Sequence, residues 1–379
     1  MAIDNKDKKI LNVPPLRFPE FTEEWKAEQL DNIATLSKGI GISKEQLSED
    51  GEPCILYGEL YTKYKSEIIK QVESKTDING SKLKRSKAND VIIPCSGETA
   101  VDIATARCVP FDNILFGGDL NVISLHQYDG AFMSYQLNGK RKYDIARVAQ
   151  GVSIVHLYGE HLKAIKTYNP TLPEQQKIAK LLSLLDDRID TQNKIIEKLQ
   201  SLIKGIAQNI VLRNKPNVRI SQCLECSSST LQESDVWEYG AYPVYGANGV
   251  VGFLDNYNTS NEAIYIIKDG SGVGAVSYVA GKCSATGTLN ILQAKKGFSL
   301  RYLYYLLNIF NFEPYKTGMA IPHIYFKDYG KAQIFCPSYS EQLKYAKFLA
   351  TIDDKLLTEQ NVLINLSLQK QYLLRQMFI

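Results

Sequence analysis

Two stretches of the chain carry apolar residues at spacings of three and four, the period of a helix that buries one face. One seam lies within 173–213 and a second, in the same register, within 338–379. A polar residue, Gln192, interrupts the first seam, and Glu359 matches it in the second. We therefore predict two long helices that pair through their seams as in a coiled coil. The predicted seam positions are Ile178, Leu181, Leu185, Ile189, Ile196, Leu199, Ile203, Ile206 and Ile210, with Tyr345, Phe348, Ile352, Leu356, Leu363, Leu366, Leu373 and Met377.

The remaining segments, roughly 25–172 and 215–337, show short apolar runs between polar turns and glycines. Such runs, rich in Val, Ile and Tyr, predict strands. We expect strands at 91–93, 122–123, 264–267 and 289–292, and short helices at 132–137 and 300–308. Each segment therefore predicts a mixed α/β domain. The resulting division is 1–172 for an N-terminal segment with the first domain, 173–213 for the first long helix, 214–337 for the second domain and 338–379 for the second long helix.

The chain repeats itself at an offset of 167 residues. Residues 173–177, Pro-Glu-Gln-Gln-Lys, reappear as Ser-Glu-Gln-Leu-Lys at 340–344. The offset also pairs Gly130 with Gly297, Tyr135 with Tyr302, Gly151 with Gly318, His156 with His323 and Tyr158 with Tyr325. Tyr57-Gly58 aligns with Tyr245-Gly246 at an offset of 188, so the first domain holds about twenty extra residues. A duplicated chain implies pseudo-two-fold symmetry, which suits a reader of two DNA half-sites.

Composition narrows the class of protein. With 44% apolar and 22% charged residues, the chain is typical of a soluble globular protein. No stretch reaches the ~18 apolar residues of a membrane span, and the polar segment 1–9 lacks a signal peptide's apolar region. Seven irregularly spaced cysteines fit reduced thiols, so we expect a cytoplasmic protein. The single C-x-x-C at Cys223 and Cys226 is interpreted as a strand edge, not a metal site.

The repeat resembles the specificity (S) subunit of type I restriction–modification systems. The likeness covers essentially the whole chain and rests on Leu-Arg-Phe-Pro-Glu-Phe at 16–21, Trp25, the x-Glu-Gln start of each long helix and two variable segments each followed by a helix. It implies an α+β fold, in which two mixed α/β target-recognition domains are joined by two long antiparallel coiled-coil helices. It also implies that the N-terminal segment packs near the far end of the second helix.

The resemblance further implies a non-catalytic chain that recognises double-stranded DNA. Its partners would be two methyltransferase subunits and the restriction subunits, with no membrane. No cofactor is expected in this chain, whereas S-adenosylmethionine, ATP and Mg²⁺ are expected in the partners. The helix starts are the candidate partner-binding residues, namely Glu174, Gln175, Lys177, Lys180, Glu341, Gln342, Lys344 and Lys347.

Candidate DNA contacts come from two local patterns. Residues 61–87 hold eight Lys or Arg against three acids, and 138–147 hold four against one, although the net charge is only +3. Such clusters neutralise phosphates. Glycine-containing loops with a serine follow the strands at 91–93 and 264–267, and Ser96-Gly97 aligns with Ser271-Gly272. The candidates are Tyr57, Tyr61, Lys63, Lys65, Lys82, Lys84, Arg85, Lys87, Ser96, Gly97, Lys140, Arg141 and Lys142, with Tyr242, Tyr245, Asn248, Ser271 and Gly272 in the second domain.

Two alternatives stay open. A coiled-coil scaffold that binds no DNA would also need the paired helices, although the basic clusters beside aromatic loops disfavour it. A self-contained nuclease or methyltransferase would need a catalytic motif, and we find neither an Asn/Asp-Pro-Pro-Tyr loop nor a phosphate-binding lysine loop. The repeated His156 and His323 are assigned a shared structural role. The pairs at 186–187 and 353–354, all aspartates, are interpreted as polar helix-face positions near partner subunits.

Overall fold

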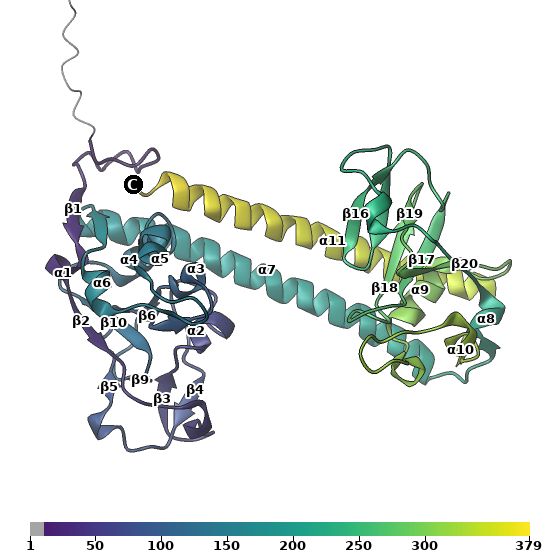
Figure 1. Cartoon of the computed structure of the whole chain (residues 1–379), viewed down its shortest axis with the longest axis horizontal. Coiled ribbons are helices and arrows are strands. Elements are labelled where there is room, and N and C mark those ends of the chain that lie inside the picture. Colours follow the sequence, from purple (N-terminus) through teal and green to yellow (C-terminus); the bar gives the residue numbers. More distant parts are fainter. Residues whose placement is uncertain (1–10) are drawn as a thin grey trace, which may run out of the picture. The chain divides into compact units, whose positions relative to one another are not determined.

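A computed structural model describes residues 11–379, so the polar segment at 1–9 lies outside the described residues. The chain divides into two compact units. The first unit contains the residues up to Thr191 together with Leu363–Ile379, and the second contains Gln192–Val362. Each unit holds one mixed α/β domain and parts of both long helices (Figure 1).

The first unit is built on a four-stranded antiparallel sheet in the order β2-β10-β6-β8. A smaller sheet, in the order β4-β3-β9-β5, contains one parallel pair, β3 with β9. The strands are β1 (Lys26–Gln29), β2 (Ala34–Lys38), β3 (Glu52–Ile55), β4 (Ser74–Thr76), β5 (Lys84–Arg85), β6 (Asp90–Pro94), β7 (Ser96–Gly97), β8 (Arg107–Val109), β9 (Leu115–Phe116), β10 (Leu120–Leu125), β11 (Val155–His156) and β12 (Lys166–Asn169). The short helices are α1 (Leu30–Ile33), α2 (Glu59–Thr62), α3 (Ala100–Ile103), α4 (Gly130–Asn138), α5 (Lys142–Val148) and α6 (Gly159–Lys163).

The second unit repeats this plan. Its larger sheet has the order β14-β20-β17-β18, and its smaller sheet, β16-β15-β19, again contains one parallel pair. The strands are β13 (Val218–Arg219), β14 (Leu224–Ser228), β15 (Tyr242–Gly246), β16 (Gly249–Leu254), β17 (Glu262–Ile267), β18 (Val276–Ala280), β19 (Ser284–Ala285), β20 (Leu289–Ala294) and β21 (Gln333–Ile334). The short helices are α8 (Ile220–Cys223), α9 (Leu300–Asn308) and α10 (Phe326–Tyr329). The predicted strands and both predicted short helices are confirmed.

Both faces of each larger sheet are buried, which explains the continuous apolar runs at its centre. In the first unit Val91 and Ile93 pack with Met133 of α4, whereas Ile92 packs with Phe116 of the smaller sheet. The second unit does the same with β17, whose alternate residues pack with α9 on one face and with the smaller sheet on the other. Each domain therefore has three layers, with a helix on one side of the main sheet and the small sheet on the other.

The long helices are α7 (Leu172–Leu212) and α11 (Tyr339–Gln376). In the first unit the start of α7, at Ile178 and Leu182, packs with the chain just beyond α11, at Met377 and Phe378. In the second unit the end of α7, at Ile210, joins the same core as the start of α11. The two helices therefore run antiparallel, as predicted.

The two polar residues that interrupt the predicted seams, Gln192 and Glu359, contact each other directly. The Gln192 side-chain amide donates to the main-chain oxygen of Glu359 at 3.0 Å and also to its carboxylate. The seam prediction is wrong at Phe348, whose side chain is 56% exposed while Leu349 is buried. The first helix likewise buries Leu182, because the start of each helix faces a domain and not only the other helix.

The repeated aspartate pairs are not simply polar surface positions, so that interpretation is corrected. Asp186 is buried, accepts a hydrogen bond from the Tyr135 hydroxyl at 2.7 Å and pairs with Lys370 at 2.7 Å. Asp353 accepts a hydrogen bond from the Tyr305 hydroxyl at 2.8 Å. Adjacent helical residues point about 100° apart, so the first aspartate of each pair faces its domain while the second faces solvent.

The N-terminal segment lies on the end of the second long helix, as the resemblance implied. The Leu16 amide donates to the Gln376 carbonyl at 2.9 Å. The Arg141 guanidinium donates to the Ile379 main-chain oxygen at 3.0 Å. Both ends of the described chain are thus held in the first unit.

Candidate nucleic-acid interface

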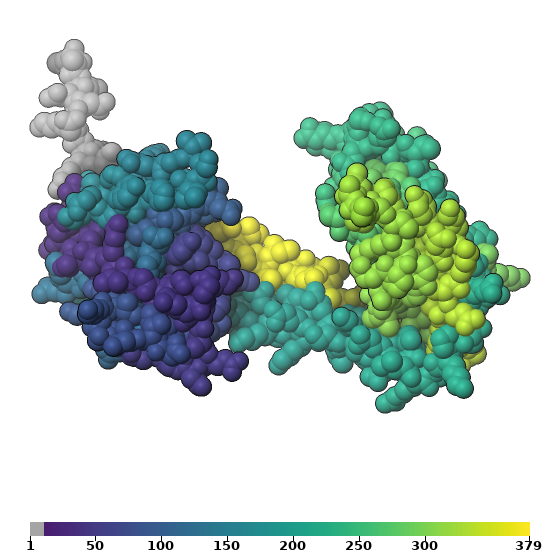
Figure 2. Space-filling view, turned by 60° about the horizontal axis from the view of Figure 1, so that its bottom comes forward, coloured from purple at the N-terminus to yellow at the C-terminus, as the bar shows by residue number. Residues whose placement is uncertain are grey.

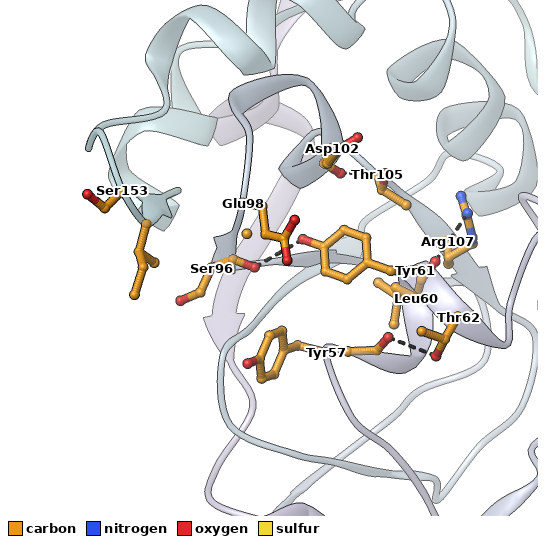
Figure 3. A pocket seen from close by; sticks show the side chains of 13 residues that line it. Tyr57, Leu60, Tyr61, Thr62, Ser96, Glu98, Asp102, Thr105, Arg107 and Ser153 are labelled. Atoms are coloured by element: carbon orange, nitrogen blue, oxygen red, sulfur yellow. Dashed lines mark hydrogen bonds between the residues drawn. The ribbon is translucent and has the colours of Figure 1, made fainter. Parts of the chain in front are cut away.

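A surface cavity of about 750 Å³ opens in the first domain. Four of the predicted DNA contacts, Tyr57, Tyr61, Ser96 and Gly97, line it (Figure 3). Tyr61 lies in α2 and Tyr57 lies two residues before it, whereas Ser96 and Gly97 form strand β7. The structure therefore brings together the aromatic and the serine–glycine candidates, which lie about forty residues apart in the sequence.

One wall of the cavity is fixed by a hydrogen bond from the Tyr61 hydroxyl to the Ser96 carbonyl at 3.0 Å. Partial burial raises the pKa of Tyr61 above its ordinary value, so the phenol stays protonated and keeps this bond. Tyr57 remains 38% exposed. Its ring offers an open π face to a base or a sugar, the kind of contact that aromatic side chains make with nucleic acids.

The sequence reasoning missed the polar groups of this cavity. Glu98, Asp102 and Thr105 line it, and Figure 3 shows Glu98 close to the Tyr61 ring. A carboxylate can accept a hydrogen bond from the amino group of cytosine in the major groove. The available signal was the position of Glu98 directly after Ser96-Gly97. Arg107 also lines the cavity, but its guanidinium donates to the Tyr64 carbonyl at 2.6 Å and to the Ala106 carbonyl at 2.9 Å.

Several predicted cations are occupied within the domain. Arg85 forms a fork with Glu52, at 2.6 and 2.9 Å, and this hydrogen bonding lowers the pKa of the Glu52 carboxyl. Lys63 contacts Glu59 at 2.8 Å and the Ser74 hydroxyl at 2.6 Å.

Arg141 holds the C-terminal residue and is also paired with Asp144 at 3.1 Å. It therefore has an internal structural role beside any DNA contact. Of the remaining predicted cations, Lys65, Lys82, Lys87 and Lys140 are exposed, and Lys84 and Lys142 are half-buried.

Strand pairing corrects two of the sequence alignments between the domains. The parallel pairs place Cys54 opposite Leu115 and Val244 opposite Ser284, so Cys54 is equivalent to Val244, an offset of 190 and not 188. Tyr57 therefore corresponds to Ala247. The dipeptides Tyr57-Gly58 and Tyr245-Gly246 have the same sequence but do not occupy equivalent positions.

The serine–glycine loops are shifted in the same way. Ser96 pairs with His156 in β7–β11, and in the second domain Asp269 pairs with His323. Ser96-Gly97 is thus equivalent to Asp269-Gly270, two residues before Ser271-Gly272. The side chains agree, since the imidazole of His323 contacts the Asp269 carboxylate at 2.6 Å and that of His156 approaches the Ser96 hydroxyl at 3.4 Å.

In the second domain the predicted residues lie on separate elements. Tyr242 and Tyr245 belong to β15, Asn248 lies in the turn to β16, and Ser271 and Gly272 are exposed in the turn after β17. The Tyr242 ring stands 5.1 Å from the ring of Tyr257, whereas the Tyr245 ring packs 5.9 Å from buried Tyr265.

A lysine lies beside the first of these tyrosine pairs, Tyr242 with Tyr257. The Lys282 ammonium lies 4.9 Å from the Tyr257 ring and 5.8 Å from the Tyr242 ring. Tyr242 is therefore part of an aromatic and cationic surface that sequence reasoning found only in part.

Among residues 11–379, no group of His, Cys, Asp and Glu has the arrangement of a metal site. The same residues contain no helix with the length and apolarity needed to span a bilayer. All seven cysteines are free thiols. Cys226 lies on strand β14 as predicted, whereas Cys223 ends helix α8, where its sulfur is 3.9 Å from that of Cys336.

Two copies of one α+β domain, each followed by a long helix, define the class of protein. The model of the type I restriction modification DNA specificity domain matches residues 22–201 and 217–366. The chain therefore belongs to this family, and the resemblance is confirmed.

Curated relatives agree. The chain is 23% identical over 190 residues to the type I restriction enzyme EcoprrI specificity subunit of Escherichia coli. It is 26% identical over 214 residues to the type I restriction enzyme MjaVIII specificity subunit of Methanocaldococcus jannaschii. These matches cover 49% and 54% of this chain, but only 41% and 45% of the relatives' own length.

Solved structures share the fold. The crystal structure of the type I restriction–modification system S subunit from M. genitalium superimposes with a TM-score of 0.68 at 19% identity, over 97% of this chain and 99% of that chain. A second match, from work on complex assembly and conformational transition of the type I R-M system, has a TM-score of 0.53 at 14% identity, over 93% and 97%. Both confirm the predicted fold class.

Proposed function

We propose that the chain is the DNA sequence-recognition subunit of a type I restriction–modification complex, each domain reading one half of a bipartite target. The observation that carries this proposal is the pair of equivalent domains with different surfaces. The first has a cavity lined by tyrosines and carboxylates, and at β15 the second has tyrosines beside Lys282. Two copies of one framework with different side chains suit two different half-sites.

The catalytic steps belong, in this proposal, to partner subunits in the cytoplasm. Two methyltransferase subunits would use S-adenosylmethionine, and restriction subunits would use ATP and Mg²⁺. This chain would contribute recognition and positioning. Because its net charge is only +3, few phosphates can be neutralised, so we expect the isolated chain to bind DNA weakly and its complex to bind tightly.

The starts of the long helices suit one partner bound twice. Lys177 and Lys180 on α7 have exposed counterparts in Lys344 and Lys347 on α11. Leu172 and its counterpart Tyr339 are 42% and 50% exposed. Similar exposed residues at equivalent positions fit two copies of the same subunit, although Lys177 also pairs with Glu20 of the N-terminal segment.

Three of the predicted partner-binding residues are left out of this proposed surface. Glu174, Gln175 and Gln342 are buried and make hydrogen bonds within their own units. Glu341 is exposed and stays in the proposal.

The paired helices suggest an experiment on the gap between half-sites. The methylated adenines of the host genome are mapped first, which gives the half-sites and the gap. Four residues are then inserted after Gln192 and four before Glu359, because these two residues contact each other and a double insertion preserves the pairing of the seams. One added turn lengthens each helix by ~6 Å and adds a rotation of about 40°.

If the helices set the spacing, the half-sites stay the same and the preferred gap changes by about one or two base pairs at the ~3.4 Å rise of DNA. Inserting into only one helix is the control for lost pairing. A folded double-insertion variant that methylates the original sites with the original gap would show that the helices do not set the spacing.

A further inference from the structure

Two loop tips expose apolar side chains at equivalent positions. The first tip is residues 151–154 and the second tip is residues 318–321, related by the 167-residue repeat. Val152 is 97% exposed and its counterpart Met319 is 106% exposed. Ile154 and its counterpart Ile321 are 60% and 58% exposed. In Figure 2 the yellow-green part of the second unit, the colour of residues near 300–330, is open to solvent on the face shown.

A reciprocal pair of backbone hydrogen bonds closes each tip. In the first domain the Gln150 amide donates to the His156 carbonyl at 2.9 Å, and the His156 amide donates back at 2.7 Å. In the second domain Thr317 and His323 make the same two bonds at 2.9 and 2.7 Å. The tips are therefore fixed loops.

Glycine makes this tight closure possible. Gly151 and Gly318 have φ values of 120° and 88°, in the region that side chains disfavour. A Cβ at these positions would lie 2.1 Å from the Ile154 carbonyl oxygen and 2.3 Å from that of Ile321. The backbone of each tip is therefore tightly closed, and the apolar side chains of the tip stay exposed to solvent.

Both tips adjoin the candidate nucleic-acid interface. Ser153 and Ile154 line the cavity of the first domain. The strand after the first tip pairs with Ser96-Gly97, and in the second domain the Gly270 amide donates to the Pro322 carbonyl at 3.0 Å. The tips are thus attached to the same turn in both domains.

A tyrosine with a lysine beside it follows each tip. Tyr158 and Tyr325 are 45% and 47% exposed. The Lys38 ammonium lies 5.7 Å from the Tyr158 ring, and the Lys327 ammonium lies 5.2 Å from the Tyr325 ring. Apolar, aromatic and cationic groups therefore occur together in both domains, although the lysines come from different elements, Lys38 from β2 and Lys327 from α10.

Exposing apolar side chains to water costs free energy, so their matched exposure in both domains points to a contact that both domains make. A duplex presents stacked bases and phosphates at every half-site, whatever its sequence. We propose that the two tips enter a DNA groove and press Val152 and Met319 against a base step, with Lys38 and Lys327 near the phosphates. Apolar wedges of this kind partly unstack and kink DNA. This inference rests on the proposed function.

The test uses the full chain assembled with its methyltransferase subunits and a duplex of the mapped target. 2-Aminopurine is placed at successive positions of each half-site, because its fluorescence rises when it is unstacked. We expect Val152→Ser to abolish the rise in the first half-site and Met319→Ser to abolish it in the second, each with about a tenfold loss of affinity. Val152→Ile and Met319→Leu should retain both signals.

Leu212→Ser is the matched control, because Leu212 is an 83%-exposed apolar residue at the end of α7. It should change neither affinity nor fluorescence. Gel filtration with the partner subunits should show normal assembly for all variants.

If the serine variants lose assembly, the tips contact a protein and the inference is overturned. If the unmodified complex binds and brightens the probe but the serine variants behave the same, only this inference fails. If the unmodified complex does not prefer the bipartite duplex, the proposed function fails as well.

Discussion

The two helix starts carry the same Glu-Gln dipeptide but use the glutamate differently. In the first unit the Glu174 carboxylate is buried, with both oxygens 2.7 Å from the Arg17 guanidinium and one 3.3 Å from the Trp25 indole nitrogen. In the second unit Glu341 is exposed and bonds to Ser338 just before its helix. The N-terminal segment supplies Arg17 and Trp25, so the same glutamate anchors a chain end in one unit and caps a helix in the other.

The glutamine of the dipeptide is used in the same way in both units. The Gln175 side chain donates to the Pro170 carbonyl at 2.8 Å and accepts from the Asp129 amide at 2.9 Å. Gln342 makes the equivalent bonds to the Pro337 carbonyl and from the Ser299 amide, both at 2.9 Å. Each glutamine thus ties the long helix to the residue that caps the short helix of its domain. Both units therefore share this contact between the long helix and the short helix, which we call the joint. The units differ because the N-terminal segment packs on the joint in the first unit and not in the second.

The largest expected effect comes from the buried charge cluster of the first unit, formed by Lys370, Asp186 and Glu67. Lys370 pairs with Asp186 at 2.7 Å and with Glu67 at 2.5 Å. Burial acts to lower the pKa of the Lys370 ammonium, but the two carboxylates outweigh it and raise the pKa. Lys370→Ala removes the ammonium that pairs with both buried carboxylates and leaves Arg107, which interacts with them without a direct ion pair, so we expect a loss of about 3–5 kcal/mol in unfolding free energy.

Urea unfolding in a Trp237→Phe background would measure this loss, because Trp25 is then the only tryptophan and reports the first unit. Arg147→Ala is the control, since Arg147 lies in the same unit and its side chain, paired with Asp144 at 3.3 Å, is 78% exposed and should contribute less than about 1 kcal/mol. Equal losses for the two variants would show that the buried cluster is not what stabilises the first joint.

The second prediction concerns the glutamates themselves. Glu174→Ala leaves the Arg17 guanidinium and the Trp25 nitrogen without their acceptor, so we expect a loss of about 2–3 kcal/mol. Glu341→Ala removes only the hydrogen bonds to Ser338 at the start of α11, so it should cost clearly less than Glu174→Ala. Urea unfolding compares the two, with Trp25 in the Trp237→Phe background reporting Glu174→Ala and Trp237 in a Trp25→Phe background reporting Glu341→Ala. A similar cost for both would mean that the N-terminal segment contributes no stability through Glu174.

The sequence predicted the repeat, the two helices and the main strands, because hydrophobic period and length define those elements well. It located equivalent residues less well. Asp129 and Ser299 cap equivalent helices at an offset of 170, so Tyr135 corresponds to Tyr305 and not to Tyr302. A constant offset fails wherever loops differ in length, and only strand pairing and helix caps show where it fails.

The candidate site was predicted in part for a similar reason. Tyr57 and Ser96 share a cavity, but the sequence does not show that Arg85 and Arg141 are paired with groups far away in the chain. A basic cluster indicates where charge lies in the sequence, not whether the charge is free. The buried role of Glu174 was missed because its partner lies 157 residues away.

The third prediction tests the joint that both units share. Gln175→Ala and Gln342→Ala should each cost about 1–2 kcal/mol, because each leaves a main-chain carbonyl and a main-chain amide, one buried and one part-buried, without its side-chain partner. Trp25 in the Trp237→Phe background follows the first unit, and Trp237 in a Trp25→Phe background follows the second. A loss in one variant but not in the other would break the equivalence of the two joints.

The smallest expected change in stability belongs to strand β5, which extends the small sheet of the first domain beyond the plan of the second. Arg85 is paired with Glu52, and both side chains are partly exposed, so Lys84→Ala combined with Arg85→Ala should change the midpoint of urea unfolding less than any variant above. If this strand reads DNA, the same variant should impair recognition of one half-site only, since a bidentate base contact contributes ~1–3 kcal/mol.

Two duplexes, each with one mapped half-site scrambled, separate the domains. The variant should weaken binding to the duplex that keeps the first half-site and leave binding to the other duplex unchanged. Glu52→Gln tests whether the fork matters in itself, because it frees the guanidinium without removing it. Unchanged affinity of the double variant for the intact target would remove β5 from the interface and make the extra strand a purely structural difference between the domains.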